Sequence, residues 1–83
     1  MWYVYILRSK RDGMLYTGYT ENLEQRLREH NNGWVSSTAK RKPLVLIRSE
    51  EYSSKETASV REKFLKSGRG RKQLKILLAR GER

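Results

Sequence analysis

Four residues of this chain have side chains suited to proton transfer and phosphate binding. Tyr5 and Tyr16 carry phenols, whose pKa near 10 must be lowered by a nearby cation or metal ion before either acts as a base at neutral pH. Arg26 and His30 stand four positions apart, which places them on one face of a helix. A guanidinium stays charged and can bind two phosphate oxygens at once. These residue types become a site only if the fold brings them together.

Each of the four also has an ordinary structural explanation. Tyrosines in strands commonly pack on a sheet face with the hydroxyl at its rim. A helix arginine commonly lies in solvent or pairs with a neighbouring carboxylate, and Glu24 and Glu29 are near Arg26. A single histidine near a helix end is commonly a capping or surface residue. The elements that hold these residues therefore have to be predicted first.

The two tyrosines lie in segments that predict a β-hairpin. Residues 2–7 are aromatic and β-branched and predict a strand, and residues 14–19 predict a second one. The polar stretch between them ends in the turn signal Asp12-Gly13. If Leu7 faces Met14 across a loop over 8–13, then Tyr5 faces Tyr16 on one face of the sheet. A tight turn centred on Asp12-Gly13 would separate the two phenols.

The rest of the chain predicts helices around a third strand. The expected elements are a helix over 20–32 capped by Thr20 or Asn22, a loop over 34–43, a strand from 44 to 47 or beyond, a helix that begins at the capping-box sequence 53–56 and ends near 67–68, and a helix over 71–80. Val60 and Phe64 are expected on the apolar side of the second helix. The order strand-strand-helix-strand-helix-helix predicts an α/β (α+β) fold, with a small three-stranded, largely antiparallel sheet flanked by helices.

Length and composition narrow the classes of protein. Eighty-three residues predict one domain over 1–83. The chain has no cysteine and only one histidine, which excludes disulfides, thiolate zinc sites, cysteine nucleophiles and metal sites built from several histidines. Its longest apolar runs are far too short to span a membrane, and its N-terminus does not resemble a secretory signal. We therefore expect a cytoplasmic protein with no membrane partner.

The charge of the chain indicates a polyanionic partner. Nineteen Lys and Arg against nine Asp and Glu give a formal net charge of +10. Residues 55–83 hold ten of the basic residues and three of the acidic ones, a local charge of +7. Such a block favours a phosphate backbone over a membrane surface, although solubility and ribosome association would also explain it.

The motifs follow one another in the order of a known family. Val4-Tyr5-Ile6, then Tyr16-Thr17-Gly18, then Asn22-Leu23 with Arg26 and His30, then Glu62 and the sequence FLKSGRG, together resemble the GIY-YIG nuclease domain over essentially the whole chain. The small stand-alone bacterial members are the most similar. The chain has Val4 in place of the name-giving glycine and Thr17 in place of isoleucine. Tyr19 stands where some relatives have lysine, so no lysine role is transferred.

This resemblance implies a DNA endonuclease that hydrolyses phosphodiester bonds with one divalent metal ion. Tyr5 would be the general base or a relay to water, Tyr16 would orient water or phosphate, and Arg26 would clamp phosphate. His30 would assist as a second base or contact phosphate. Glu62 would hold Mg²⁺ or Mn²⁺, since such an ion often takes only one or two carboxylates beside water and substrate. Gly18 is expected to let the substrate or the first helix approach the backbone closely.

The basic C-terminal half is expected to hold nucleic acid without reading its sequence. The residues expected to contact phosphates are Lys66, Arg69, Arg71 and Lys72. DNA is favoured over RNA by the resemblance alone, and the substrate shape could be branched, nicked, flapped or single-stranded. Two alternatives stay open. One is a non-catalytic nucleic-acid- or ribosome-binding module on the same fold, and the other is an interaction domain whose charge serves solubility.

Overall fold

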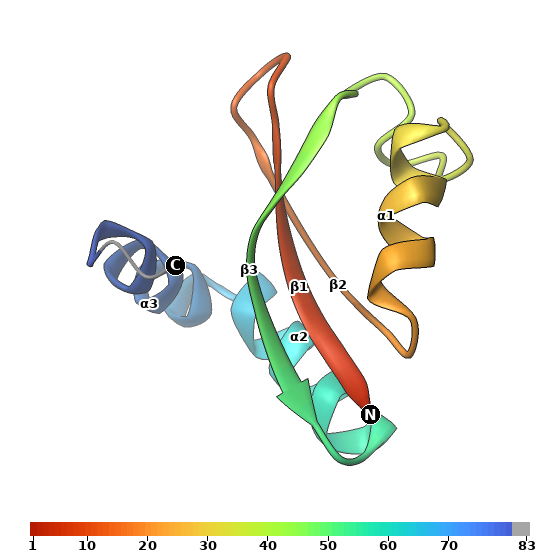
Figure 1. Cartoon of the computed structure of the whole chain (residues 1–83). Helices are drawn as coiled ribbons and strands as arrows, with labels where there is room; N and C mark the ends of the chain where they lie inside the picture. Colours follow the sequence, from red (N-terminus) through yellow and green to blue (C-terminus); the bar gives the residue numbers. More distant parts are fainter. Residues whose placement is uncertain (81–83) are drawn as a thin grey trace.

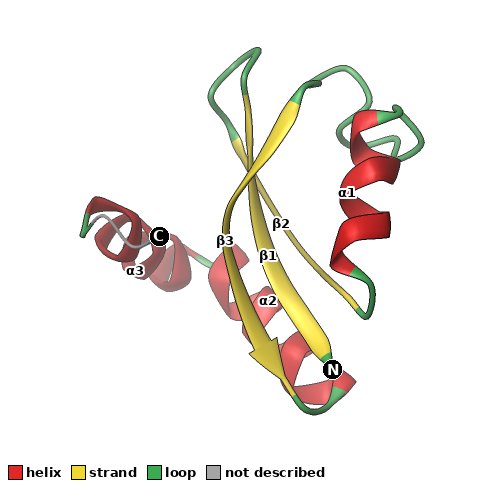
Figure 2. Cartoon of the chain, in the orientation of Figure 1, coloured by secondary structure: helices red, strands yellow, loops and turns green. Residues whose placement is uncertain are grey.

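The computed structural model describes residues 1–80 as a three-stranded antiparallel sheet with helices on both faces (Figure 1). Strands β1 (Trp2–Ser9), β2 (Leu15–Thr20) and β3 (Leu44–Tyr52) lie in the order β2-β1-β3, so β1 is central and β2 is an edge strand. Helix α1 (Leu23–Asn31) covers one face, while α2 (Lys55–Lys66) covers the other and leads into α3 (Gly68–Ala79) (Figure 2). The predicted fold class and element order are confirmed.

The register of the β1–β2 hairpin differs by two residues from the predicted one. Tyr5 pairs with Gly18 and Leu7 pairs with Tyr16, so the two phenols are diagonal neighbours rather than opposite each other. The prediction was wrong because β1 continues to Ser9, whose N–H bonds the Met14 carbonyl at 2.9 Å and closes a shorter loop. A shift of two residues keeps each side chain on its predicted face.

Capping side chains explain where the helices begin. Helix α1 is shorter than the predicted 20–32, because Asn22 accepts the Gln25 N–H and so caps the helix at Leu23. Ser54 caps α2 by accepting the Thr57 N–H, one residue later than the predicted capping box. Ser67 caps α3 by accepting the Gly70 N–H, so α3 begins before the predicted residue 71.

Gly70 lets α3 start tightly against the end of α2. A Cβ on Gly70 would lie on top of the Phe64 carbonyl oxygen, and the residue is buried. The two glycines of the sequence FLKSGRG therefore belong to the first turn of a helix and not to a linker.

Each face of the sheet has its own apolar core. On the α2–α3 side, the buried core residues are Val4, Ile6, Ala58, Leu65 and Leu74. On the α1 side they are Tyr5, Leu7 and Leu44, with Leu23 and Leu27 of α1 packed against them. Residues of β1 alternate between these cores, as expected for a central strand.

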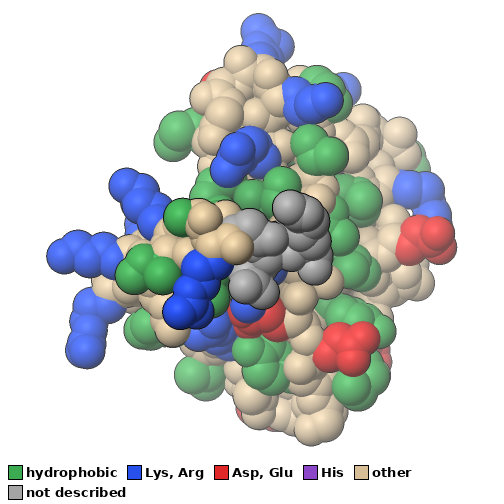
Figure 3. All heavy atoms as spheres, turned by 60° about the vertical axis from the view of Figure 1, so that its left-hand side comes forward, with side chains coloured by type: hydrophobic (Ala, Val, Ile, Leu, Met, Phe, Trp, Pro, Cys, Tyr) green, Lys and Arg blue, Asp and Glu red, His purple; other side chains and the backbone are tan. Residues whose placement is uncertain are grey.

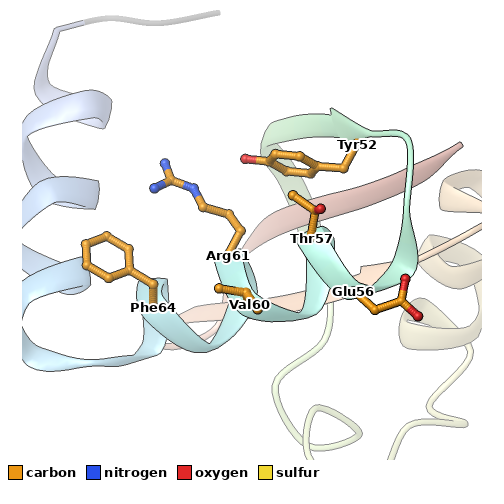
Figure 4. Close-up of a pocket in the computed structure, with 6 residues that line it drawn as sticks. All are labelled: Tyr52, Glu56, Thr57, Val60, Arg61 and Phe64. Carbon is orange, nitrogen blue, oxygen red and sulfur yellow. The ribbon is translucent and has the colours of Figure 1, made fainter.

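Val60 and Phe64 do not take part in either core, which corrects the sequence prediction. They are 68% and 37% exposed and line a shallow groove with Tyr52 on the solvent side of α2 (Figure 4). The spacing of the apolar residues along the helix predicted that both side chains face inward. In the structure, the buried side of α2 consists of Ala58, Glu62 and Leu65.

The basic residues of the C-terminal half project around α3. Figure 3, which brings this side of the molecule forward, shows Lys and Arg side chains extending into solvent here. Helix α3 contains Arg69, Arg71, Lys72 and Lys75, all exposed, and has no acidic residue. None of the helices described within residues 1–80 has the length and apolar character needed to cross a membrane.

Candidate active site

Tyr5 is buried in the middle of the sheet, and Gly18 is the reason that it fits. The phenol is 2% exposed and lies over Gly18, its partner on the edge strand β2. A Cβ on residue 18 would lie 2.5 Å from the Tyr5 hydroxyl oxygen. The group that approaches the Gly18 backbone most closely in the structure is the Tyr5 side chain and not the first helix, and the expected approach of a substrate stays a prediction.

Helix α1 brings an arginine and a histidine onto the Tyr5 hydroxyl. Nε of Arg26 donates to this oxygen over 3.4 Å, and Nε2 of His30 lies 3.0 Å from it. The one-turn spacing of the two residues places both on the helix face that covers β1. The Tyr16 ring completes the group, with its centroid 4.9 Å from that of His30 and 6.3 Å from that of Tyr5. The structure thus brings Tyr5, Tyr16, Arg26 and His30 together.

A threonine that the sequence did not single out continues this hydrogen-bond chain. Oγ1 of Thr38 lies 2.7 Å from Nδ1 of His30, and the same hydroxyl can donate to the Val35 carbonyl over 3.4 Å. Both His30 and Thr38 have no exposed surface. Thr38 comes from the loop after α1, where no periodic pattern marks a residue as inward-facing, so only the fold reveals it.

The ionisation of this group follows from its burial. Burial raises the pKa of Tyr5, and this effect exceeds the opposing hydrogen bond from Arg26. The Arg26 cation therefore does not bring this pKa below its ordinary value in the protein chain alone. Burial and the Arg26 charge lower the pKa of His30, so its ring is neutral at neutral pH. The hydrogen bond to Glu29 raises the pKa of Arg26 and keeps its guanidinium charged.

Glu62 reaches the same region from the opposite face of the sheet. It is 8% exposed on α2, and its charge is one of the contributions that raise the pKa of Tyr5. Its carboxylate pairs with Lys66, whose ammonium also lies 5.8 Å above the centre of the Tyr16 ring. No cluster of three or more His, Cys, Asp or Glu side chains that could hold a metal is found within residues 1–80.

Arg61, the neighbour of Glu62, joins α2 to β3. The Arg61 side chain binds both oxygens of Glu50 on β3, over 2.9 and 3.1 Å. Burial alone would raise the pKa of Glu50, but hydrogen bonds from Arg61 and Tyr52 lower it to about 2. This salt bridge holds the Arg61 side chain against β3, while the Glu62 carboxylate pairs with Lys66.

Half of the predicted phosphate contacts lie in a groove beside the site. Lys66 and Arg71 line it together with Lys75, and Tyr16 forms part of its wall. The groove encloses about 460 Å³ between the start of β2 and α3. Arg69 and Lys72, the other two predicted contacts, are exposed and do not line it. Lys75 was missed, although its position one turn after Arg71 would have indicated it.

Comparison with known proteins identifies the family. The model of the GIY-YIG catalytic domain matches residues 1–75. A UPF0213 protein of Staphylococcus haemolyticus is 43% identical over 76 residues, which cover 90% of this chain and 92% of that protein. A UPF0213 protein of Natronomonas pharaonis is 46% identical over 66 residues, 78% of this chain and 76% of that one. The solution NMR structure of a UPF0213 protein from Bacillus halodurans has 40% identity and a TM-score of 0.57, covering 93% of this chain and 85% of that one. The match to the family model and the similarity to the UPF0213 proteins lead to one conclusion: the chain belongs to the GIY-YIG family, a superfamily of nucleases.

Proposed function

We propose that this protein is a DNA endonuclease that hydrolyses phosphodiester bonds, with Tyr5 as the base and one divalent metal ion held by Glu62. The observation that supports this most strongly is the buried chain in which Arg26, Tyr5 and His30 are joined by hydrogen bonds. Membership of the GIY-YIG family implies a nucleic acid substrate. A purely structural phenol would have no use for both a charged donor and a neutral imidazole on its hydroxyl.

In this proposal Tyr5 passes a proton from water to His30. The attacking water gives a proton to the phenol oxygen while the phenol proton moves to Nε2 of His30, which lies 3.0 Å away. The water oxygen forms the new bond to phosphorus, the bond to the leaving oxygen breaks with its electron pair on that oxygen, and the leaving oxygen takes a proton from solvent water. His30 suits the acceptor role because its pKa is lowered and its ring is neutral before the reaction.

Arg26 would stabilise the charge that develops on the phosphate. Its guanidinium has five N–H groups, of which one is directed at Tyr5 and one at Glu29. The remaining N–H groups are available for phosphate oxygens. The ion pair with Glu29, 2.9 Å long, orients the guanidinium plane beside the phenol.

The residues around Glu62 fit a single Mg²⁺ or Mn²⁺ ion. The carboxylate is largely buried, and its ion pair is with a half-exposed lysine that can move into solvent. Such an ion prefers oxygen ligands and tolerates few protein ligands, since water and phosphate fill the other positions. When bound, it would supply positive charge to the phosphate oxygens. Release of Lys66 from Glu62 would also free that ammonium to bind phosphate.

The groove beside Tyr16 would hold the backbone of the substrate. Lys66, Arg71 and Lys75 would contact its phosphates, with Arg69 and Lys72 adding charge farther from the site. Contacts of this kind do not read the sequence, so we expect the enzyme to select a DNA shape.

The test is cleavage of end-labelled single-stranded, duplex, flap and branched DNA with Mg²⁺ or Mn²⁺, and with EDTA as control. The Glu62→Gln variant should lose cutting, whereas Glu56→Gln, the same change at an exposed position of α2, should keep it. Wild-type protein that binds these DNAs in a salt-sensitive way but cuts none of them would favour the alternative of a non-catalytic binding module. Cutting that survives Glu62→Gln would refute the metal-holding role.

A further inference from the structure

The two ends of the buried hydrogen-bond chain have fixed chemical character. At one end, Nε–H of Arg26 can only donate, and its bond goes to the Tyr5 hydroxyl. At the other end, the Val35 carbonyl can only accept, and it accepts from the Thr38 hydroxyl as well as from the Thr38 N–H. Between these ends, each hydroxyl and each ring nitrogen that donates a hydrogen bond must face a group that accepts it.

The need to pair every donor with an acceptor assigns the position of each proton in this series of hydrogen bonds. If Thr38 donates to Val35, its oxygen accepts from Nδ1–H of His30. Nε2 is then unprotonated and accepts from the Tyr5 hydroxyl, whose oxygen still accepts from Arg26. The opposite arrangement has Thr38 donating to Nδ1 and Nε2–H donating to Tyr5. It leaves the buried Tyr5 proton without an acceptor among the bonds described for residues 1–80, and such a loss is costly.

The loop that carries Thr38 is held in place at several points. The Thr38 N–H bonds the Val35 carbonyl at 3.0 Å, and the Thr38 carbonyl accepts from the Arg41 N–H at 2.9 Å. Oγ of Ser9, itself buried in β1, donates to the Arg41 carbonyl at 2.6 Å. These bonds hold the fully buried Thr38 hydroxyl beside the ring of His30. An apolar side chain would satisfy packing at this position equally well.

We infer that Thr38 is a positioning residue that fixes His30 as the Nδ1–H tautomer, so that Nε2 faces Tyr5 ready to take its proton. This inference rests on the proposed function for its catalytic meaning, but the tautomer itself is a property of the protein without substrate. Free histidine favours the Nε2–H tautomer, which could not accept a proton from Tyr5. The hydrogen bond made by the other ring nitrogen decides which form a histidine takes.

The single histidine makes the tautomer directly measurable. In uniformly ¹⁵N-labelled protein at about pH 8, where the ring is neutral, long-range ¹H–¹⁵N spectra give one pair of ring nitrogens. Wild-type protein should show Nδ1 at a protonated shift and Nε2 at an unprotonated one. The Thr38→Val variant removes the hydroxyl while keeping the branched shape, and should move the ring toward the Nε2–H form. Thr38→Ser should keep the wild-type pattern.

Cleavage rates of the same variants connect the tautomer to the reaction. Thr38→Val should slow cutting about 10–100-fold, a typical cost of removing the outer partner of a functional imidazole, and Thr38→Ser should restore most of the rate. A wild-type spectrum of the Nε2–H form would overturn the inference, even if Thr38→Val did not fold. Wild-type rates and an unchanged tautomer in Thr38→Val would also overturn it. Protein with the expected tautomer that cuts no nucleic acid would refute the proposed nuclease function and leave the role of Thr38 in fixing the tautomer supported.

Discussion

Replacing Gly18 by alanine should disable Tyr5 without removing any group that reacts. The new Cβ would lie 2.5 Å from the Tyr5 hydroxyl oxygen and 2.6 Å from the ring carbon that bears it. Carbon atoms in contact are normally about 3.5–4 Å apart, so the end of the ring must shift by roughly 1 Å. That shift is large against a 3.0 Å bond to His30 and should cost about 100-fold in cutting rate.

The same overpacking should lower stability by about 1–3 kcal/mol, or roughly 4–8 °C in melting temperature for each kcal/mol in a domain of this size. Gly68→Ala is the matched control, because a Cβ there meets no atom within 4 Å. Single-turnover cleavage at saturating protein would measure the chemical step, and thermal unfolding would measure stability. Both are expected to stay close to wild type in Gly68→Ala.

A double-mutant cycle tests whether the rate loss acts through the hydroxyl. In a Tyr5→Phe background the hydroxyl is already gone, so adding Gly18→Ala should slow cutting little further. If the two losses multiplied, Gly18 would act by another route. Wild-type cutting by Gly18→Ala at an unchanged melting temperature would show that the phenol does not need its place over residue 18, and would refute the reasoning.

Three further predictions follow from the same geometry. Tyr5→Phe should bind DNA normally and cut about 10²–10⁴-fold more slowly. Binding titrations would measure the affinity, and single-turnover assays would measure the cutting rate. A wild-type rate would exclude Tyr5 as the base. Because burial and a neighbouring guanidinium lower the pKa of His30, the cutting rate should hold as pH falls through 6.5 and decline only below it; a rate–pH profile with its acid limb at or above 6.5 would contradict this. The unfolded chain binds more protons in that window, so this group's contribution to unfolding free energy should also decrease as pH falls below 6.5. Lys75→Ala should weaken binding and flatten its salt dependence by about one unit of slope, whereas Lys72→Ala, on the same helix but outside the groove, should do so less; equal effects would argue against the groove.

The sequence was sufficient to predict which faces of the hairpin and of α1 meet, although not which face of α2 is buried. Period-two alternation in the hairpin placed Tyr5 and Tyr16 on one face, and the four-residue spacing of Arg26 and His30 placed both on one side of a helix. These are local properties, which a two-residue error in register does not change. The convergence of these four side chains in the structure follows from them.

The rest of the site depends on contacts that no local pattern describes. Thr38 lies in an aperiodic loop, and it faces His30 because hydrogen bonds from the distant Ser9 and within the loop fold it back. Arg61, the neighbour of Glu62 on α2, is held by Glu50 on β3. Both relations join residues far apart in sequence, so spacing along the chain could not reveal them.

The burial of Tyr5 and His30 argues for a particular order of proton movement. Burial raises the pKa of the phenol and lowers that of the imidazole, so a resting phenolate–imidazolium pair is unfavourable on both sides. The phenol should therefore stay neutral until a water molecule supplies the proton that replaces its own. Arg26, which contacts the phenol oxygen and carries a permanent charge, is placed to stabilise the negative charge that passes through this atom during the transfer. An exposed phenol would ionise more readily but would also donate and accept protons with bulk water. Burial of Tyr5 and His30 limits proton exchange with bulk water and leaves His30 as the neighbouring acceptor of the phenol proton.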